Sequence, residues 1–142
     1  MQIKVAWQDN VHFLANNEQG HTVAMDGPEE AGGQNQGARP LELMLMGLGG
    51  CTAFDVVDIL RKGRQQITDL TVDIRAQRAD EIPAVFENID LHFVVTGLAI
   101  DEARVRRAID LTAEKYCSAS IMLERAGVKI AHTFEILEDE FG

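Results

Sequence analysis

Two cysteines, Cys51 and Cys117, are the residues of this chain whose chemistry could define a function. Each lies in an apolar stretch with helical periodicity, so both side chains are predicted to point inward. A free cysteine in such a place most often acts as a small buried hydrophobic residue, and composition alone favours that interpretation. The alternative is thiol chemistry, for which the thiolate is the reactive form.

The residues around Cys51 give conflicting electrostatic signals. A glycine inside a helix costs about 1 kcal/mol relative to alanine, so Gly49-Gly50 indicates either a helix break or the close approach of another element. A break would place Cys51 at the start of a new helical segment, whose dipole favours a thiolate. Asp55 and Asp58 follow on the same helical side and would oppose a thiolate. Thiol chemistry at Cys51 therefore requires a compensating cation.

The nearest cations and the nearest glutamate before Cys51 are too far from its thiol along a straight helix. Arg39 and Arg61 are the nearest cations, and Arg39 lies about 18 Å away along the helix axis. Glu42 is about 13 Å away, so it could reach the thiol only through a bend or from a second chain. A site shared between subunits would follow. The local alternative is that Glu42 interacts with the dipole of its own helix.

The hydrophobic periodicity predicts an α+β fold with mostly antiparallel sheet and two long helices. The expected elements are three strands within residues 1–26, a helix over 40–62, strands over 69–78 and 86–96, a helix over 101–125 capped by Asp101, and a closing strand within 128–136. Hairpins separate the helices, which excludes a doubly wound parallel sheet. Residues 27–38 are predicted to form a mobile loop, and the acidic tail 138–142 is predicted to be frayed.

The composition limits the number of domains and the kinds of partner. A chain of 142 residues with 46% hydrophobic content fits one domain spanning 1–142. A formal charge of −10 would repel nucleic acid and anionic membranes. The first residues lack a secretory signal, and the apolar run 43–54 is shorter than the ~20 residues of a membrane span. We therefore expect a cytoplasmic protein, where a permanent disulfide is disfavoured.

Cofactor signatures are missing from the sequence. The histidines are scattered and show no close pairing with one another or with the cysteines, so no metal site is predicted. Glycines 47, 49 and 50 lie inside an apolar helix rather than between a strand and a helix, so they do not form a phosphate-binding loop. No bound cofactor is expected.

Two segments around the cysteines resemble the OsmC/Ohr family of osmotically induced and organic hydroperoxide resistance proteins. Residues 38–57, Ala-Arg-Pro-Leu-Glu-Leu-Met-Leu-Met-Gly-Leu-Gly-Gly-Cys-Thr-Ala-Phe-Asp-Val-Val, resemble the family's central helix. Residues 113–120, Ala-Glu-Lys-Tyr-Cys-Ser-Ala-Ser, resemble its second-cysteine helix. Residues 21–27 and 91–97 are similar to the YhfA-like branch. The resemblance covers nearly the whole chain.

The resemblance implies an intertwined homodimer with both active sites at the subunit interface. Cys51 would be the peroxidatic thiol that attacks a small hydroperoxide, and Cys117 would resolve the resulting sulfenic acid as a disulfide. A dithiol such as dihydrolipoamide would regenerate the thiols. The implied function is a thiol-dependent organic hydroperoxide reductase acting in oxidative stress defence, a peroxiredoxin-type activity.

Two positions depart from the pattern of the active family members. They carry a glutamate ten residues before the first cysteine, where this chain has Leu41, with Glu42 as the neighbouring substitute. They also carry an arginine in the N-terminal sheet, whereas the first arginine here is Arg39. These departures favour an alternative function, a non-catalytic protein that binds a small hydrophobic ligand at the dimer interface. The cysteine on each helix favours the peroxidase.

Overall fold

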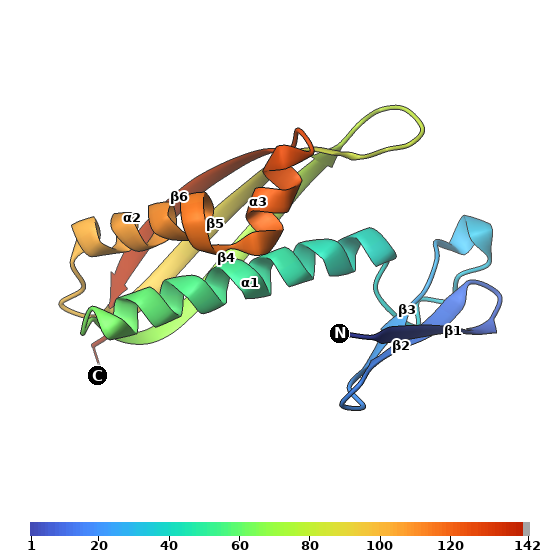
Figure 1. Ribbon diagram of the computed structural model, residues 1–142, viewed down its shortest axis with the longest axis horizontal. Helices are drawn as coiled ribbons and strands as arrows, with labels where there is room; N and C mark the ends of the chain where they lie inside the picture. Colours follow the sequence, from blue (N-terminus) through green and yellow to red (C-terminus); the bar gives the residue numbers. More distant parts are fainter. Residues whose placement is uncertain (141–142) are drawn as a thin grey trace. The chain divides into compact units, whose positions relative to one another are not determined.

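The structure, a computed structural model, describes residues 1–140 (Figure 1). The chain forms two compact units, Met1–Met46 and Gly47–Gly142, which are described separately below. The predicted α+β class is confirmed, with one three-stranded sheet in each unit. The predicted single domain over 1–142 stays a prediction. The predicted frayed tail lies partly outside the described residues.

The first unit contains a small antiparallel sheet with the strand order β1-β2-β3. Its strands are β1 (Ile3–Asp9), β2 (His12–Asn17) and β3 (Thr22–Met25). The hairpin between β2 and β3 turns at the predicted place, because the side chain of Asn17 accepts hydrogen bonds from the backbone N–H groups of Gln19 and His21. Gly20 completes the turn with a φ of 85°, a conformation that glycine adopts without steric cost.

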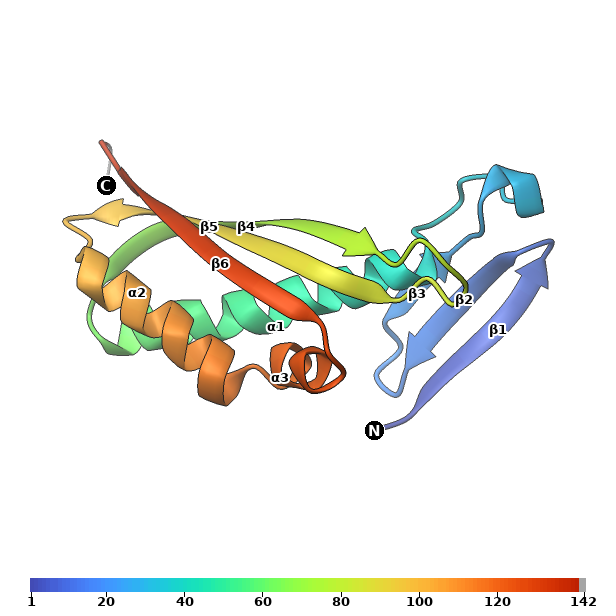
Figure 2. The same ribbon diagram turned by 90° about the horizontal axis from the view of Figure 1, so that it is seen from above.

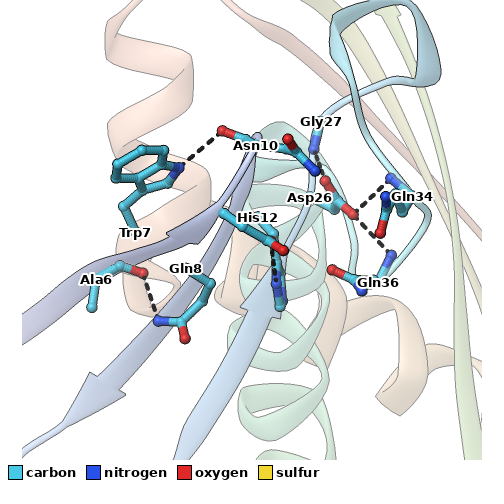
Figure 3. A network of polar contacts seen from close by, with 10 residues as sticks. Ala6, Trp7, Gln8, Asn10, His12, Asp26, Gly27, Gln34 and Gln36 are labelled. Atoms are coloured by element: carbon cyan, nitrogen blue, oxygen red, sulfur yellow. Dashed lines mark hydrogen bonds and ion pairs between the residues drawn. The ribbon is translucent and has the colours of Figure 1, made fainter.

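Asp26 organises the loop that follows β3 (Figure 3). Its buried carboxylate accepts hydrogen bonds from the backbone N–H groups of Gly27 at 2.8 Å and of Gln34 and Gln36 at 3.0 Å. The loop also contains a short 3₁₀ helix, Glu29–Ala31. Residues 27–38 form the predicted loop, and one carboxylate binds backbone N–H groups near both of its ends, while its mobility stays a prediction. Composition could not reveal this, because the bonded groups are backbone N–H groups.

Helix α1 (Pro40–Lys62) begins and ends where the sequence predicts. Of the two alternatives for Gly49-Gly50, the helix break is absent, because the helix is continuous through both residues. Close approach explains Gly49 instead: a Cβ there would lie 2.7 Å from Cδ1 of Ile74. Helix α1 is long and apolar enough to cross a membrane, since it contains an 18-residue window with a mean hydropathy of 1.7. This differs from the expectation that the apolar run 43–54 is too short for a membrane span. The core helix of a soluble protein meets the same criteria.

The second unit contains a sheet with the strand order β4-β5-β6. Strand β4 (Gln66–Arg78) pairs antiparallel with β5 (Phe86–Leu98), and β6 (Lys129–Glu138) pairs parallel with β5. The helices of this unit cover one face of the sheet (Figure 2). Strand β5 lies in the centre, and its alternate residues Ile89, Leu91, Phe93 and Val95 are fully buried. This alternation forms the core that holds the helices in place.

The predicted single helix over 101–125 is wrong, because the structure divides it. Helix α2 (Glu102–Leu111) begins at the predicted cap, Asp101, whose carboxylate accepts a hydrogen bond from the Ala103 N–H at 2.9 Å. A π-helical turn (Thr112–Tyr116) follows, and α3 (Ser118–Arg125) comes after it. The Thr112 hydroxyl donates to the Ala108 carbonyl at 2.7 Å, a type of bond that often bends helices. The break leaves Cys117 between two helices.

Candidate active site

The second unit brings Cys51 and Cys117 together. Cys51 lies on α1 and Cys117 lies at the break between α2 and α3, and their Sγ atoms are 3.3 Å apart. Both cysteines are free thiols. A disulfide has an S–S length of about 2.05 Å, so the sulfurs need to approach by only about 1.3 Å to form one. The two thiols are therefore placed for reversible pairing.

The two thiols differ in their access to solvent. Cys51 is half-buried, whereas Cys117 is fully buried with 0% of its surface exposed. Cys51 is therefore the more accessible residue of the pair. This asymmetry suits a pair in which one sulfur meets the substrate and the other reacts second.

Cys117 occupies the N-cap position of α3. Its backbone is extended, with φ −79° and ψ 100°, and its Sγ accepts a hydrogen bond from the Ser120 N–H at 3.4 Å. Burial nevertheless raises the pKa of the Cys117 thiol, and the Ser120 N–H lowers it by less. The helix-start position that the sequence predicts for Cys51 is therefore occupied by Cys117. Its burial keeps the thiol form of Cys117.

Asp55 lies beside both sulfurs. One of its carboxylate oxygens and the two Sγ atoms all lie within 4.8 Å of one another. Asp55 is one helical turn after Cys51, so α1 places both side chains on one face, as predicted. Asp58, predicted on the same side, instead forms an ion pair with Lys62 at 2.9 Å.

The carboxyl group of Asp55 is poorly compensated. Its Oδ2 is buried and has no hydrogen-bond partner among residues 1–140. Burial is the main cause that raises the pKa of Asp55, and the charge of Asp58 raises it further. The ion pairs of the described chain include none with Asp55. The two thiols therefore lie next to a carboxyl group that forms no ion pair within residues 1–140.

Arg39 and Glu42 have a local role in the first unit. Arg39 precedes the first residue of α1, and its backbone N–H donates to Oε1 of Glu42 at 2.8 Å. This bond is half of a capping box, in which the third helical residue reaches back to the N-cap. The structure therefore bears out the local alternative for Glu42. The predicted catalytic roles of Arg39 and Glu42 stay predictions.

Two polar residues beside the cysteines were not singled out as site residues from the sequence. Thr52 and Ser120 are both fully buried, and their hydroxyl oxygens have no hydrogen-bond partner in the described chain. Ser120 lies three residues after Cys117 in the sequence. The signal that could have found it is the spacing Cys-x-x-Ser, which places its N–H against an N-cap sulfur.

An open groove is lined by Gly50 and Ala53, two residues close to Cys51 in the sequence. It is formed by α1 and the first residues of β4, and Phe54, at 71% exposure, contributes its ring. The residues that line the groove are Gly50, Ala53, Phe54, Val57, Asp58, Arg61, Lys62, Ile67, Thr68, Asp69 and Leu70. Exposed apolar side chains of this kind typically mark a surface for a partner or a ligand.

Comparison with known proteins agrees with this fold. The family model described as OsmC-like protein matches residues 33–133, so the chain belongs to the family of OsmC-like proteins and the predicted resemblance is confirmed. It is 44% identical to Protein YhfA of Escherichia coli strain K12 over 137 residues, which are 96% of this chain and 98% of that protein.

Solved structures share the same fold. A hypothetical protein from Aquifex aeolicus VF5 has a TM-score of 0.85 and 25% identity, over 98% of this chain and 97% of that chain. An organic hydroperoxide resistance protein OsmC from Legionella pneumophila has a TM-score of 0.72 and 16% identity, over 94% and 95% of the two chains. At that identity the second comparison shows the fold alone.

Proposed function

We propose that this chain is a thiol-dependent organic hydroperoxide reductase, with Cys51 as the peroxidatic thiol and Cys117 as the resolving thiol. The observation that carries the proposal is the 3.3 Å separation of the two Sγ atoms. The likeness in fold to a hydroperoxide resistance protein supports it. The unequal exposure of the two thiols supports the assignment of the two roles.

In the first step the Cys51 thiolate attacks the outer oxygen of a hydroperoxide ROOH. An S–O bond forms and the O–O bond breaks, so the sulfur loses two electrons and becomes a sulfenic acid. The leaving alkoxide takes a proton and departs as the alcohol ROH. The half-buried position of Cys51 gives a small hydroperoxide access to the sulfur.

In the second step Cys117 attacks the sulfenic sulfur. The S–S bond forms, the S–O bond breaks, and the hydroxyl leaves as water with the proton of the Cys117 thiol. Because burial raises the pKa of Cys117, this thiol keeps its proton until the sulfenic acid is in place. An external dithiol then reduces the disulfide by thiol–disulfide exchange, which fits a reducing cytoplasmic location.

A homodimer would complete this site. Activation of Cys51 requires a cation, and none of the ion pairs in the described chain involves Asp55 beside it. We propose that the partner subunit supplies the cation and Glu42 to a shared site, with Arg39 as the candidate cation. In this proposal the exposed Phe54 and the groove between α1 and β4 are the surface for that contact.

The second candidate is a non-catalytic protein that binds a small hydrophobic ligand. The observation that favours it is the unpaired Asp55 carboxyl beside the sulfurs, which opposes a thiolate. The absence of arginine before residue 39 favours it as well. In that case the groove beside Phe54 would hold the ligand, and the cysteines would be core residues.

The proposal is tested by mixing the reduced protein with cumene hydroperoxide in a stopped-flow instrument and quantifying the thiols by mass spectrometry. The wild type is expected to lose two thiols rapidly as one intramolecular disulfide. Cys117→Ser is expected to accumulate a sulfenic acid on Cys51. Cys51→Ser is expected to react only at the rate of a buried thiol.

Oxidation of the wild type no faster than that of free cysteine would reject the reductase and favour the ligand-binding function. Sulfenic acid on Cys117 rather than Cys51 would reverse the assigned roles. Asp80→Asn is the matched control, because it removes an exposed acidic group from the loop between β4 and β5. Its oxidation rate should equal that of the wild type.

A further inference from the structure

We propose that the reduced protein binds one thiophilic divalent cation, of which Zn²⁺ is the model ion, through Cys51, Cys117 and Asp55. The three ligand atoms all lie within 4.8 Å of one another. The sequence gives no indication of this site, because its ligands come from α1 and from the break between α2 and α3. Binding itself is independent of the proposed reductase activity, and its effect on oxidation rests on that activity.

The distance between the sulfurs suits a shared ion. Zn–S bonds are about 2.3 Å long, so two sulfurs at tetrahedral angles lie about 3.8 Å apart. The observed separation is 3.3 Å, so the sulfurs need to move apart by only about 0.5 Å. Rotation of the two side chains can supply this movement, and the helices need not move.

The chemistry of the ligands selects the kind of ion. Two thiolates and one carboxylate match the sulfur, nitrogen and oxygen ligands of Zn²⁺, whereas Mg²⁺ and Ca²⁺ take only oxygen ligands. Three protein ligands leave the fourth tetrahedral position for water. The half-buried position of Cys51 leaves one side of the site open to solvent for that water.

The charge around the site favours a cation. Oδ2 of Asp55 is buried without a hydrogen-bond partner within residues 1–140, and none of the ion pairs in that range involves Asp55. A carboxylate and two thiolates next to one another repel, and a bound divalent ion offsets most of that charge. A bound ion would also give the unpaired carboxylate oxygen a partner.

Metal binding and disulfide formation exclude each other. Both thiols lose their protons to solvent when the ion binds, and both sulfurs donate electron pairs to it. In the disulfide these electrons have gone to the oxidant, and the sulfurs are about 2.05 Å apart. An ion of this class would therefore protect the thiols and slow the reaction with hydroperoxide until it is removed.

The test is a titration of the reduced, chelator-treated protein with Co²⁺ and then Zn²⁺, without peroxide. Co²⁺ should produce the thiolate charge-transfer absorption and the visible bands of a tetrahedral site, with one ion bound per chain. Zn²⁺ should displace it, and calorimetry should give the same stoichiometry. Because no oxidation step is involved, failure of the reductase proposal would leave this result unaffected.

Variants distinguish the residues that bind the ion from residues that do not contact it. Loss of a group that only orients a ligand costs about 10–100-fold in metal affinity, so Cys51→Ser and Asp55→Asn should each weaken binding at least that much. Asp55→His should restore affinity, since imidazole is also a zinc ligand. Asp80→Asn is the matched control and should bind like the wild type, because Asp80 is an exposed residue of the loop between β4 and β5. Circular dichroism of each variant checks that it is folded.

Three results would overturn the site. They are a Co²⁺ spectrum without thiolate charge transfer, unchanged affinity in Cys51→Ser, and unchanged affinity in folded Asp55→Asn. Protection from oxidation is a separate measurement. If the wild type reacts with cumene hydroperoxide, saturating Zn²⁺ should slow its thiol loss at least about 10-fold, whereas Zn²⁺ should have no such effect on Asp55→Asn at the same concentration.

Discussion

The sulfur of Cys117 caps helix α3 by accepting a hydrogen bond from the backbone N–H of Ser120 at 3.4 Å. The resolving thiol of the proposed reaction therefore also has a structural role. Substitutions of Cys117 consequently need to be separated into those that keep a cap and those that lose it.

We predict that Cys117→Ala destabilises the reduced protein more than Cys117→Ser does. Serine is among the preferred N-cap residues, and replacing an N-cap by alanine costs about 1 kcal/mol. Alanine also leaves a small cavity at a fully buried site. Urea unfolding under reducing conditions measures the difference. Equal midpoints for the two variants would show that the sulfur of Cys117 is not a cap.

The tight contact between α1 and β4 gives a second prediction. A Cβ at Gly49 would lie 2.7 Å from Cδ1 of Ile74, whereas a Cβ at Gly50 would meet no atom within 4 Å. Gly50→Ala is therefore expected to gain about 1 kcal/mol of helix stability, and Gly49→Ala to lose about 1–2 kcal/mol from overpacking.

A double variant tests the cause. Ile74→Val removes the Cδ1 atom, so the pair Gly49→Ala with Ile74→Val should recover most of the loss, which is a coupling between the two sites. Thermal unfolding of the wild type, the two single variants and the double variant measures this coupling energy. Additive effects would mean that Gly49 is required for another reason.

Asp26 gives a prediction about acid stability. Hydrogen bonds from backbone N–H groups, that of Gln36 first, lower the pKa of Asp26 in the folded protein. A carboxyl group with a lowered pKa contributes stability above its unfolded pKa of about 3.9, and this contribution is lost as the pH falls toward the folded pKa. The wild type should therefore lose stability below about pH 4 more steeply than Asp26→Asn.

The check is the urea midpoint of both proteins between pH 7 and the acid limit. Asp26→Asn should be less stable at pH 7, because an amide offers one acceptor oxygen for three N–H donors. The difference should shrink in acid. A constant difference across the pH range would contradict the role of the ionised carboxylate in holding the loop.

Local patterns predicted most of the fold. Alternation along β5 and the Pro40 start of α1 place these elements correctly, because each follows from residues adjacent in sequence. The division of the second helix was not predicted. Its residues are compatible with a continuous helix, and the π-helical turn depends on a hydrogen bond between Cys117 N–H and the Thr112 carbonyl.

The site was predicted only in part. The sequence singles out Cys51 and Cys117 as candidate redox residues and Asp55 as a neighbour of Cys51, since Asp55 is one turn away on the same helix. It could not place Cys117 at 3.3 Å from Cys51, because the two are 66 residues apart and their contact depends on packing against the sheet. The metal site follows only from that contact.

The last prediction concerns Asp55 and the rate of oxidation. A carboxylate about 5 Å from a thiolate destabilises it by roughly 1 kcal/mol even with the dielectric of water, which corresponds to about fivefold in the thiolate population. Asp55→Asn, freed of metal with a chelator, should therefore react with cumene hydroperoxide about fivefold faster than the wild type. Asp58→Asn should show no such gain, since Asp58 is paired with Lys62. A slower reaction of Asp55→Asn would instead mean that the carboxyl group assists the chemistry of Cys51, for example by accepting its proton.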